Sequence, residues 1–134
     1  MLFRILFFSF LFVSGNVFSQ KKFHTCHEIS ADEFNALNQA HPEFFVVDIR
    51  SETDFIKNHI SGAVHIPNDS ILRTVTKTLD ADQFVLVYDD QGDISVDACL
   101  LMASEGLVSV YHLRGGIRQW MQLGFPLVKE PKKE

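Results

Sequence analysis

Carboxylates gather in one short segment, directly after an apolar run of the chain. The run Phe84-Val85-Leu86-Val87-Tyr88 is followed by Asp89-Asp90-Gln91-Gly92-Asp93, and a helical pattern starts at Ser95. A buried strand, a tight loop and a helix bring backbone N–H groups together at the helix start, where they favour an anion. The spacing therefore predicts a site at this loop, with Asp89 as its first residue.

Three interpretations of the loop carboxylates remain open. Asp89 could act as a built-in anion that accepts the N–H groups of the residues after it, since Asp is a good acceptor at a helix start. The loop could instead hold a divalent cation through Asp89, Asp90, Asp93 and Asp97, because hard cations take several oxygen ligands, although the spacing is not that of an EF-hand. Lastly, it could be a solvated loop without a ligand.

Along the sequence, the chain contains four apolar runs and five helical patterns, and this loop joins the third run to the fourth helical pattern. The run 44–49 lacks the alternation of a half-exposed strand, which is typical of strands buried on both faces. The alternation of the four runs with helical patterns predicts βαβ units and a mostly parallel sheet within one domain. The expected strands are 44–49, 63–66, 84–88 and 108–113. One helix is expected to start at the Ser30 cap, with Phe34 and Leu37 on one face, and the other expected helices are 51–58, 70–79, 95–105 and 117–123.

The helix after the loop has an apolar stripe and a clear end. Gly106 is expected to terminate it, since glycine is the usual residue just past a helix. The stripe consists of Val96, Cys99, Leu100 and Ala103. A thiol in such a stripe is expected to be buried and unreactive.

The chain has two cysteines, Cys26 and Cys99. The stretch His24-Thr25-Cys26-His27 has no second cluster at zinc-site spacing, so no metal is expected there. A disulfide between Cys26 and Cys99 would be chemically allowed after export. Sequence cannot judge its geometry, and the pairing stays open at this point.

The first residues have the pattern of an export signal. Arg4 precedes the apolar run Ile5–Val13, and Val17 and Ser19 place small residues at a cleavage position. An uncleaved membrane anchor is the alternative, but the apolar run is shorter than the ~20 residues of a spanning helix. We expect a periplasmic or secreted protein, divided into a signal peptide (1–19), an N-terminal arm (20–28), one domain (29–128) and a polar tail (129–134).

The charge of the chain limits its partners. Its formal net charge is −5, and Lys and Arg form no cluster. Nucleic acid is therefore an unsuitable partner. No cofactor and no membrane contact after removal of the signal are expected, and the expected state is a monomer that binds a protein partner or a small ligand of unknown identity.

Three further motifs identify the scaffold. They are Val47-Asp48-Ile49-Arg50, then His59-Ile60-Ser61-Gly62-Ala63-Val64-His65-Ile66-Pro67, and last Tyr111-His112-Leu113-Arg114-Gly115-Gly116-Ile117-Arg118-Gln119-Trp120. In this order and spacing the chain resembles the rhodanese homology domain from about Ile29 to Val128. The resemblance implies an α/β fold with an about five-stranded, mostly parallel sheet flanked by helices on both faces.

The resemblance also bears on the loop. Rhodaneses carry a nucleophilic Cys at the end of the central strand and often an Arg in the loop, where this chain has Asp89 and Ile94. It thus implies an inactive domain with no catalytic residue, acting as a binding or regulatory module. The alternatives are a sulfurtransferase with residual or atypical activity and a hydrolase that uses Asp89 as an acid. The expected contact residues are Asp89, Asp90, Gln91, Gly92, Asp93, Ile94 and Ser95.

The other motif residues are expected to have structural roles. Asp48 and Arg50 end a buried strand and should pair with nearby backbone or charge, and His59 and His65 should be held by hydrogen bonds. Ile117 and Trp120 should be buried against the sheet. The three motif glycines should occupy positions that disfavour a Cβ; they are Gly62, Gly115 and Gly116.

Overall fold

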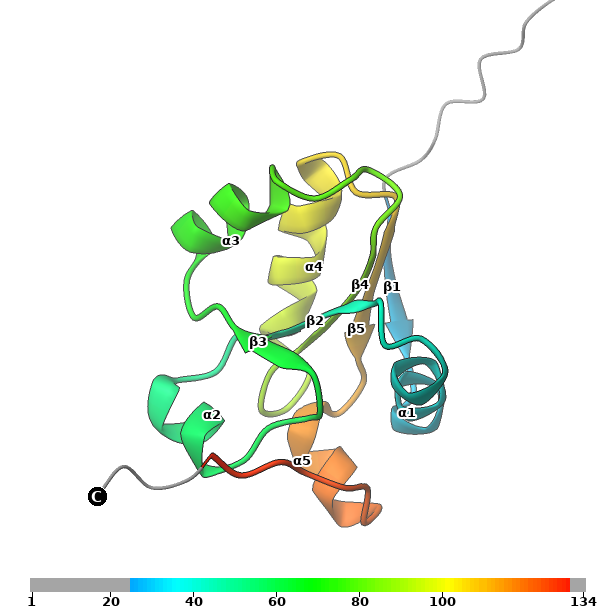
Figure 1. Ribbon diagram of the computed structural model, residues 1–134, viewed down its shortest axis with the longest axis vertical. Helices are drawn as coiled ribbons and strands as arrows, with labels where there is room; N and C mark the ends of the chain where they lie inside the picture. Colours follow the sequence, from blue (N-terminus) through cyan, green and yellow to red (C-terminus); the bar gives the residue numbers. More distant parts are fainter. Residues whose placement is uncertain (1–24, 131–134) are drawn as a thin grey trace, which may run out of the picture.

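A computed structural model describes residues 25–130, which fold around a five-stranded sheet (Figure 1). The strand order is β1-β5-β4-β2-β3, and every pairing is parallel. The predicted parallel α/β architecture is confirmed. The strands are β1 (Cys26–Ile29), β2 (Phe45–Asp48), β3 (Ala63–His65), β4 (Phe84–Tyr88) and β5 (Ser109–Leu113).

Helices lie on both faces of the sheet. Helices α3 and α4 cover one face, and α1 and α5 lie over the other (Figure 1). A helix follows each strand and carries the chain back toward the end of the sheet at which the strands start, as parallel pairing requires. The helices are α1 (Ala31–Ala40), α2 (Glu52–Lys57), α3 (Asp69–Thr76), α4 (Ser95–Ser104) and α5 (Gly116–Gln122).

The start of α1 is set by local hydrogen bonds. The backbone N–H of Glu33 donates to Ser30 Oγ at 3.2 Å, and the N–H of Ser30 donates to Glu33 Oε2 at 2.9 Å. This is the reciprocal capping box that the sequence predicts. Phe34 in the first turn is then fully buried, so the cap also orients an apolar face toward the sheet.

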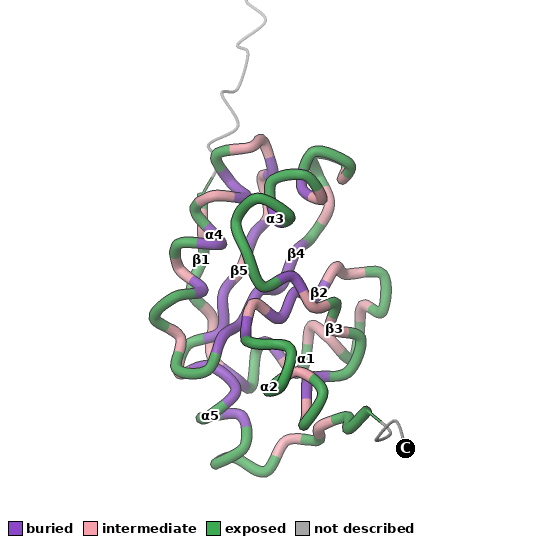
Figure 2. Tube along the Cα trace, turned by 90° about the vertical axis from the view of Figure 1, so that its left-hand side faces the viewer, coloured by how far each residue is buried: buried purple, intermediate pink, exposed green. Residues whose placement is uncertain are grey.

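The core has two parts, one on each face of the sheet. Beneath α3 and α4 it includes Val85, Val87 and Cys99. On the face of α1 and α5 it includes Tyr88 and Trp120. Figure 2 shows the inner strands β2, β4 and β5 mostly as buried segments, whereas the edge strands β1 and β3 are partly exposed. Because β4 contributes to both parts, its carboxyl end leads directly from the core into the candidate loop.

The structure corrects several sequence expectations. Residues Cys26–Ile29 form edge strand β1, although the sequence placed Cys26 in an arm without a strand. The strand carries polar residues and pairs only with β5, so it lacks the apolar pattern of the others. Helix α3 ends at Thr76, not at residue 79. Leu100 is 53% exposed and is not part of the buried stripe of α4.

Some predicted segments lie outside the described residues. These are the export signal (1–19), the first part of the arm (20–24) and residues 131–134. Within residues 25–130, no helix is both long and apolar enough to cross a membrane. The backbone N–H of Glu130, in the predicted tail, donates to the carbonyl of Ile56 at 3.3 Å.

Candidate functional site

The candidate site is the loop between β4 and α4, at the carboxyl end of the central part of the sheet. α/β domains with parallel sheets commonly bind ligands at the carboxyl ends of their strands. Asp89 directly follows β4 and is only 3% exposed, while Asp90 and Asp93 are exposed. The three carboxylates therefore differ in environment, and only Asp89 points into the protein.

Both oxygens of the Asp89 carboxylate are hydrogen-bonded. Oδ1 accepts the N–H of Gly92 at 2.5 Å and the hydroxyl of Ser95 at 3.2 Å. Oδ2 accepts the N–H of Ile94 at 2.7 Å and that of Ser95 at 3.2 Å. These bonds bear out the built-in anion and rule out a solvated Asp89.

Helix α4 consequently starts without a cap of the usual kind. Its N-cap residue is Ile94, which has no side chain that could accept a hydrogen bond. Asp89, five residues earlier, supplies the acceptor. The negative charge of a carboxylate at this position also interacts favourably with the positive end of the helix dipole. The loop thus satisfies its own N–H groups, and a second anion would have to compete with Asp89.

The first residues of helix α5 form hydrogen bonds with the backbone of the loop. The N–H groups of Ile117 and Arg118 donate to the carbonyls of Asp89 and Asp90, each at 3.0 Å. Free N–H groups at a helix start need such acceptors. Hydrogen bonds therefore join the backbone carbonyls of the loop to the start of α5, and the side chain of Asp89 to the start of α4.

Gly92 is required by close packing in this region. Its φ is +87°, a left-handed conformation that L side chains rarely adopt. A Cβ at this position would lie 2.6 Å from the backbone nitrogen of Gly115 and 2.9 Å from the carbonyl oxygen of Leu113. The loop and the turn before α5 are therefore in direct backbone contact.

The acidic side chains do not converge on a cation. Asp90 instead forms an exposed ion pair with Arg118 at 2.9 Å. Among residues 25–130, no three His, Cys, Asp or Glu side chains form a group that could hold a metal ion. The cation interpretation of Asp89, Asp90, Asp93 and Asp97 therefore lacks a site. His24 lies outside the described residues, and Cys26 of the same stretch is not a free thiol.

A small cavity lies beside the loop, between α3 and α4. It holds about 190 Å³. Its charged lining residues are Asp69 and Asp97, with no Lys or Arg. An anion entering it would be repelled. The remaining lining residues are Ile49, Ile66, Pro67, Asn68, Leu72, Ile94 and Ala98.

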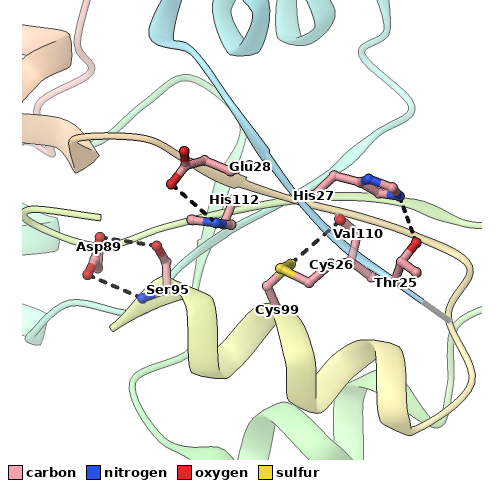
Figure 3. The surroundings of a disulfide bond; sticks show 9 residues. All are labelled: Thr25, Cys26, His27, Glu28, Asp89, Ser95, Cys99, Val110 and His112. Atoms are coloured by element: carbon pink, nitrogen blue, oxygen red, sulfur yellow. Dashed lines mark hydrogen bonds and ion pairs between the residues drawn. A yellow bond between two sulfur atoms is a disulfide. The ribbon is translucent and has the colours of Figure 1, made fainter. Parts of the chain in front are cut away.

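His112 on β5 is a buried neighbour that the sequence analysis did not single out. It lies between Glu28 and Asp89 in Figure 3, with Nε2 3.8 Å from Glu28 Oε2. Its Nδ1 is buried and has no hydrogen-bond partner. Burial lowers the pKa of His112, and the charges of Glu28 and Asp89 partly oppose that shift. Its place in β5 was visible in sequence, but its two acidic neighbours come from β1 and from the loop after β4.

Cys26 and Cys99 form a disulfide that joins β1 to α4 (Figure 3). Their Cα atoms are 5.5 Å apart, within the range that a disulfide allows. The chain has no other cysteine. In this oxidised form no thiol is free to act as a nucleophile.

The expected structural residues are where the motifs placed them. Arg50 pairs with Asp48 at 2.7 Å, and both are buried. Nδ1 of His59 lies 2.9 Å from the carbonyl of Phe55. His65 Nε2 lies 2.6 Å from the carbonyl oxygen of Arg50. Ile117 and Trp120 are buried as expected, and Gly62, Gly115 and Gly116 all have positive φ.

A single parallel sheet between two helical layers, with the loop that contains Asp89 at the end of its central strand, defines an α/β domain. Residues 30–123 match the family of rhodanese-like domains. The protein belongs to this family, and the expected resemblance is confirmed.

Known relatives and structures agree with the assignment. A thiosulfate sulfurtransferase GlpE from Pseudomonas fluorescens is 40% identical over 76 residues, covering 56% of this chain and 68% of the relative. A tRNA uridine(34) hydroxylase from Sodalis glossinidius is 32% identical over 110 residues, covering 75% of this chain but 31% of its own length. The crystal structure of a rhodanese-related protein from Thermoplasma volcanium superimposes with a TM-score of 0.65 at 30% identity, covering 78% of this chain and 99% of that one.

Proposed function

We propose that the protein is an exported, non-catalytic rhodanese-like domain that acts as a binding or regulatory module through residues 89–95. The observation that carries the proposal is the Asp89 carboxylate, which accepts hydrogen bonds from Gly92, Ile94 and Ser95. In the family, this position is expected to hold the nucleophilic Cys. An Asp in its place cannot form a persulfide.

Two further features support a loss of sulfur transfer. Residues 89–95 include no Lys or Arg that could attract an anionic sulfur donor. Both cysteines are joined in the disulfide, and Cys99 is fully buried. A reactive thiol needs exposure and a positive environment, and Cys99 has neither in this state.

The outer side of the loop suits a protein partner. Ile94 is 63% exposed and lies beside exposed Asp93 and Asp90. Ile94 thus forms an exposed apolar tip of the loop, with carboxylates next to it. Such a surface fits a partner that offers an apolar contact and basic side chains. The proposed state is a monomeric protein in the periplasm or the secreted fraction, which meets this partner after export.

Sulfur transfer is the second candidate, and the name of the GlpE relatives is the observation that favours it. A thiosulfate:cyanide sulfur-transfer assay separates the two. We expect no turnover by the unmodified protein. Turnover that disappears in Cys99→Ser would overturn the proposal, and Asp89→Cys tests whether the scaffold regains activity when the thiol is restored.

Binding through the loop is tested by pull-down from the cell envelope. Ile94→Ser should abolish recovery of the partner, because it removes the apolar tip. Leu100→Ser is the matched control, since Leu100 is exposed on the same helix but outside the loop. Equal recovery by both variants would place the contact surface elsewhere.

A further inference from the structure

The cavity between α3 and α4 lies where both helices start. It holds about 190 Å³, which is less than the about 300–1,000 Å³ of pockets that enclose whole small-molecule ligands. Figure 1 shows the two helices next to each other on one face of the sheet, and the ion pair between Arg73 and Glu105 joins α3 to the residue after α4. A cavity of this size fits a single side chain of a larger partner.

The lining of the cavity is largely apolar. Ile66, Leu72 and Ala98 line its inner part and are at most 5% exposed. Ile94 and Pro67 also line it, and both are exposed. An aliphatic chain that covers Ile94 and Pro67 removes apolar surface from water, which favours binding.

Two carboxylates accompany the apolar lining, one from each helix. Asp69 lies in the first turn of α3 and Asp97 in the first turn of α4, and both are exposed. Neither carboxylate forms an ion pair with any residue in the range 25–130. The cavity therefore combines an apolar lining with two negative charges that have no cationic partner in this part of the chain.

The starts of the two helices do not cancel this negative charge. Each positive helix end is equivalent to roughly half an elementary charge. At α4 the Asp89 carboxylate already balances that end, and at α3 the side chain of Asn68 caps it. Asp69 and Asp97 consequently leave a negative potential at the cavity, which attracts a cation.

We propose that the cavity receives one lysine side chain of the protein partner. The aliphatic stem of this lysine packs on Ile94 and Pro67. Its ammonium group lies between Asp69 and Asp97. Carboxylates from two separate helices offer acceptors from two directions, which fits the three donors of an ammonium group better than the planar fork of an arginine.

The inference rests on the proposed binding function of residues 89–95, because Ile94 belongs both to that loop and to the cavity lining. It adds the chemical group that the partner supplies. A partner that contacts the exposed side chain of Ile94 has the mouth of the cavity directly beside its contact surface.

Nuclear magnetic resonance titration of the full chain with N-acetyl-lysine amide tests the cavity. We expect the methyl signals of Ile66, Leu72 and Ala98 to shift, because these side chains line its inner part. The comparison probe is N-acetyl-norleucine amide, which has the same four-carbon stem without the ammonium group. It should bind about tenfold more weakly, since it lacks both ion pairs.

Paired substitutions test the two carboxylates. Asp69→Asn with Asp97→Asn keeps the shape of the side chains and should lower the affinity for the lysine probe to that for the norleucine probe. The matched control is Asp80→Asn with Asp82→Asn, which removes the same charge from exposed positions outside the cavity lining. It should leave the affinity for the lysine probe unchanged.

Two outcomes of the titrations would overturn the inference. One is a lysine probe that binds no more tightly than the norleucine probe. The other is an unchanged affinity for lysine in the Asp69→Asn, Asp97→Asn variant. The pull-down separates this inference from the proposed function. Recovery of the partner that is lost in Ile94→Ser but kept in the double Asn variant contradicts the lysine site alone. Unchanged recovery in Ile94→Ser, together with lysine binding in the cavity, contradicts the contact role of the loop alone.

Discussion

The backbone N–H of Ile94 donates to the carboxylate of Asp89 at 2.7 Å, so the N-cap residue of α4 is bonded to the residue that directly follows β4. This bond closes the loop on itself. The most buried of the acidic residues in the loop thereby balances the positive end of a helix.

Asp89→Asn should destabilise the fold by about 1–3 kcal/mol, because an amide NH₂ cannot accept the N–H groups that the carboxylate accepts now. Urea denaturation measures the free energy of unfolding. Asp97→Asn is the control, since Asp97 is exposed on α4, the helix that Asp89 caps. This substitution should change the free energy of unfolding by no more than about 0.5 kcal/mol. Equal effects of both substitutions would contradict the capping role of Asp89.

Gly92→Ala should cost more stability than Gly62→Ala. Both glycines have a positive φ, at +87° and +83°, so both variants carry backbone strain of about 1–2 kcal/mol. Only a Cβ at Gly92 meets neighbouring backbone atoms; at Gly62 nothing lies within 4 Å. Thermal or urea unfolding compares the two, and a smaller loss for Gly92→Ala would disprove close packing of the loop on the turn before α5.

Reduction of the Cys26–Cys99 disulfide should lower the free energy of unfolding by about 2–5 kcal/mol. The bond closes a long loop, with a sequence separation of 73, and ties edge strand β1 to α4. Urea curves with and without dithiothreitol measure the loss. In a Cys26→Ala, Cys99→Ala double variant the reductant should have no effect; a remaining response would show that it acts elsewhere.

Stability should increase with pH because of His112. Burial lowers the pKa of His112 below its ordinary value of 6.5, so the unfolded chain takes up a proton at a pH where the folded protein does not. Between the lowered pKa and about 6.5, the unfolded state binds more protons, and the free energy of unfolding rises with pH. Below the lowered pKa, both states are protonated and this contribution is lost.

The pH dependence is measured as urea midpoints between pH 4.5 and 8, a range chosen to bracket the ordinary pKa of about 6.5. His112→Gln removes the titrating group and should flatten the curve in this window. An unchanged slope in the variant would assign the pH dependence to other groups, such as the carboxylates.

Local patterns were sufficient to predict the elements that carry the motifs. The capping box at Ser30 and the apolar run before Asp89 depend on residues within one turn or one strand, so sequence shows them directly. Asp89 as a built-in anion was also predictable, because its partners lie three to six residues further along. Strand β1 was missed since an edge strand needs no apolar pattern on either face.

Sequence by itself determined the α/β order, the family and the carboxylate at the end of β4. Only the tertiary structure decided that Cys26 meets Cys99 and that His112 lies near both Glu28 and Asp89. Those relationships join residues far apart in the chain. They depend on which strands become neighbours, and that is set by the packing of the whole sheet rather than by any local pattern.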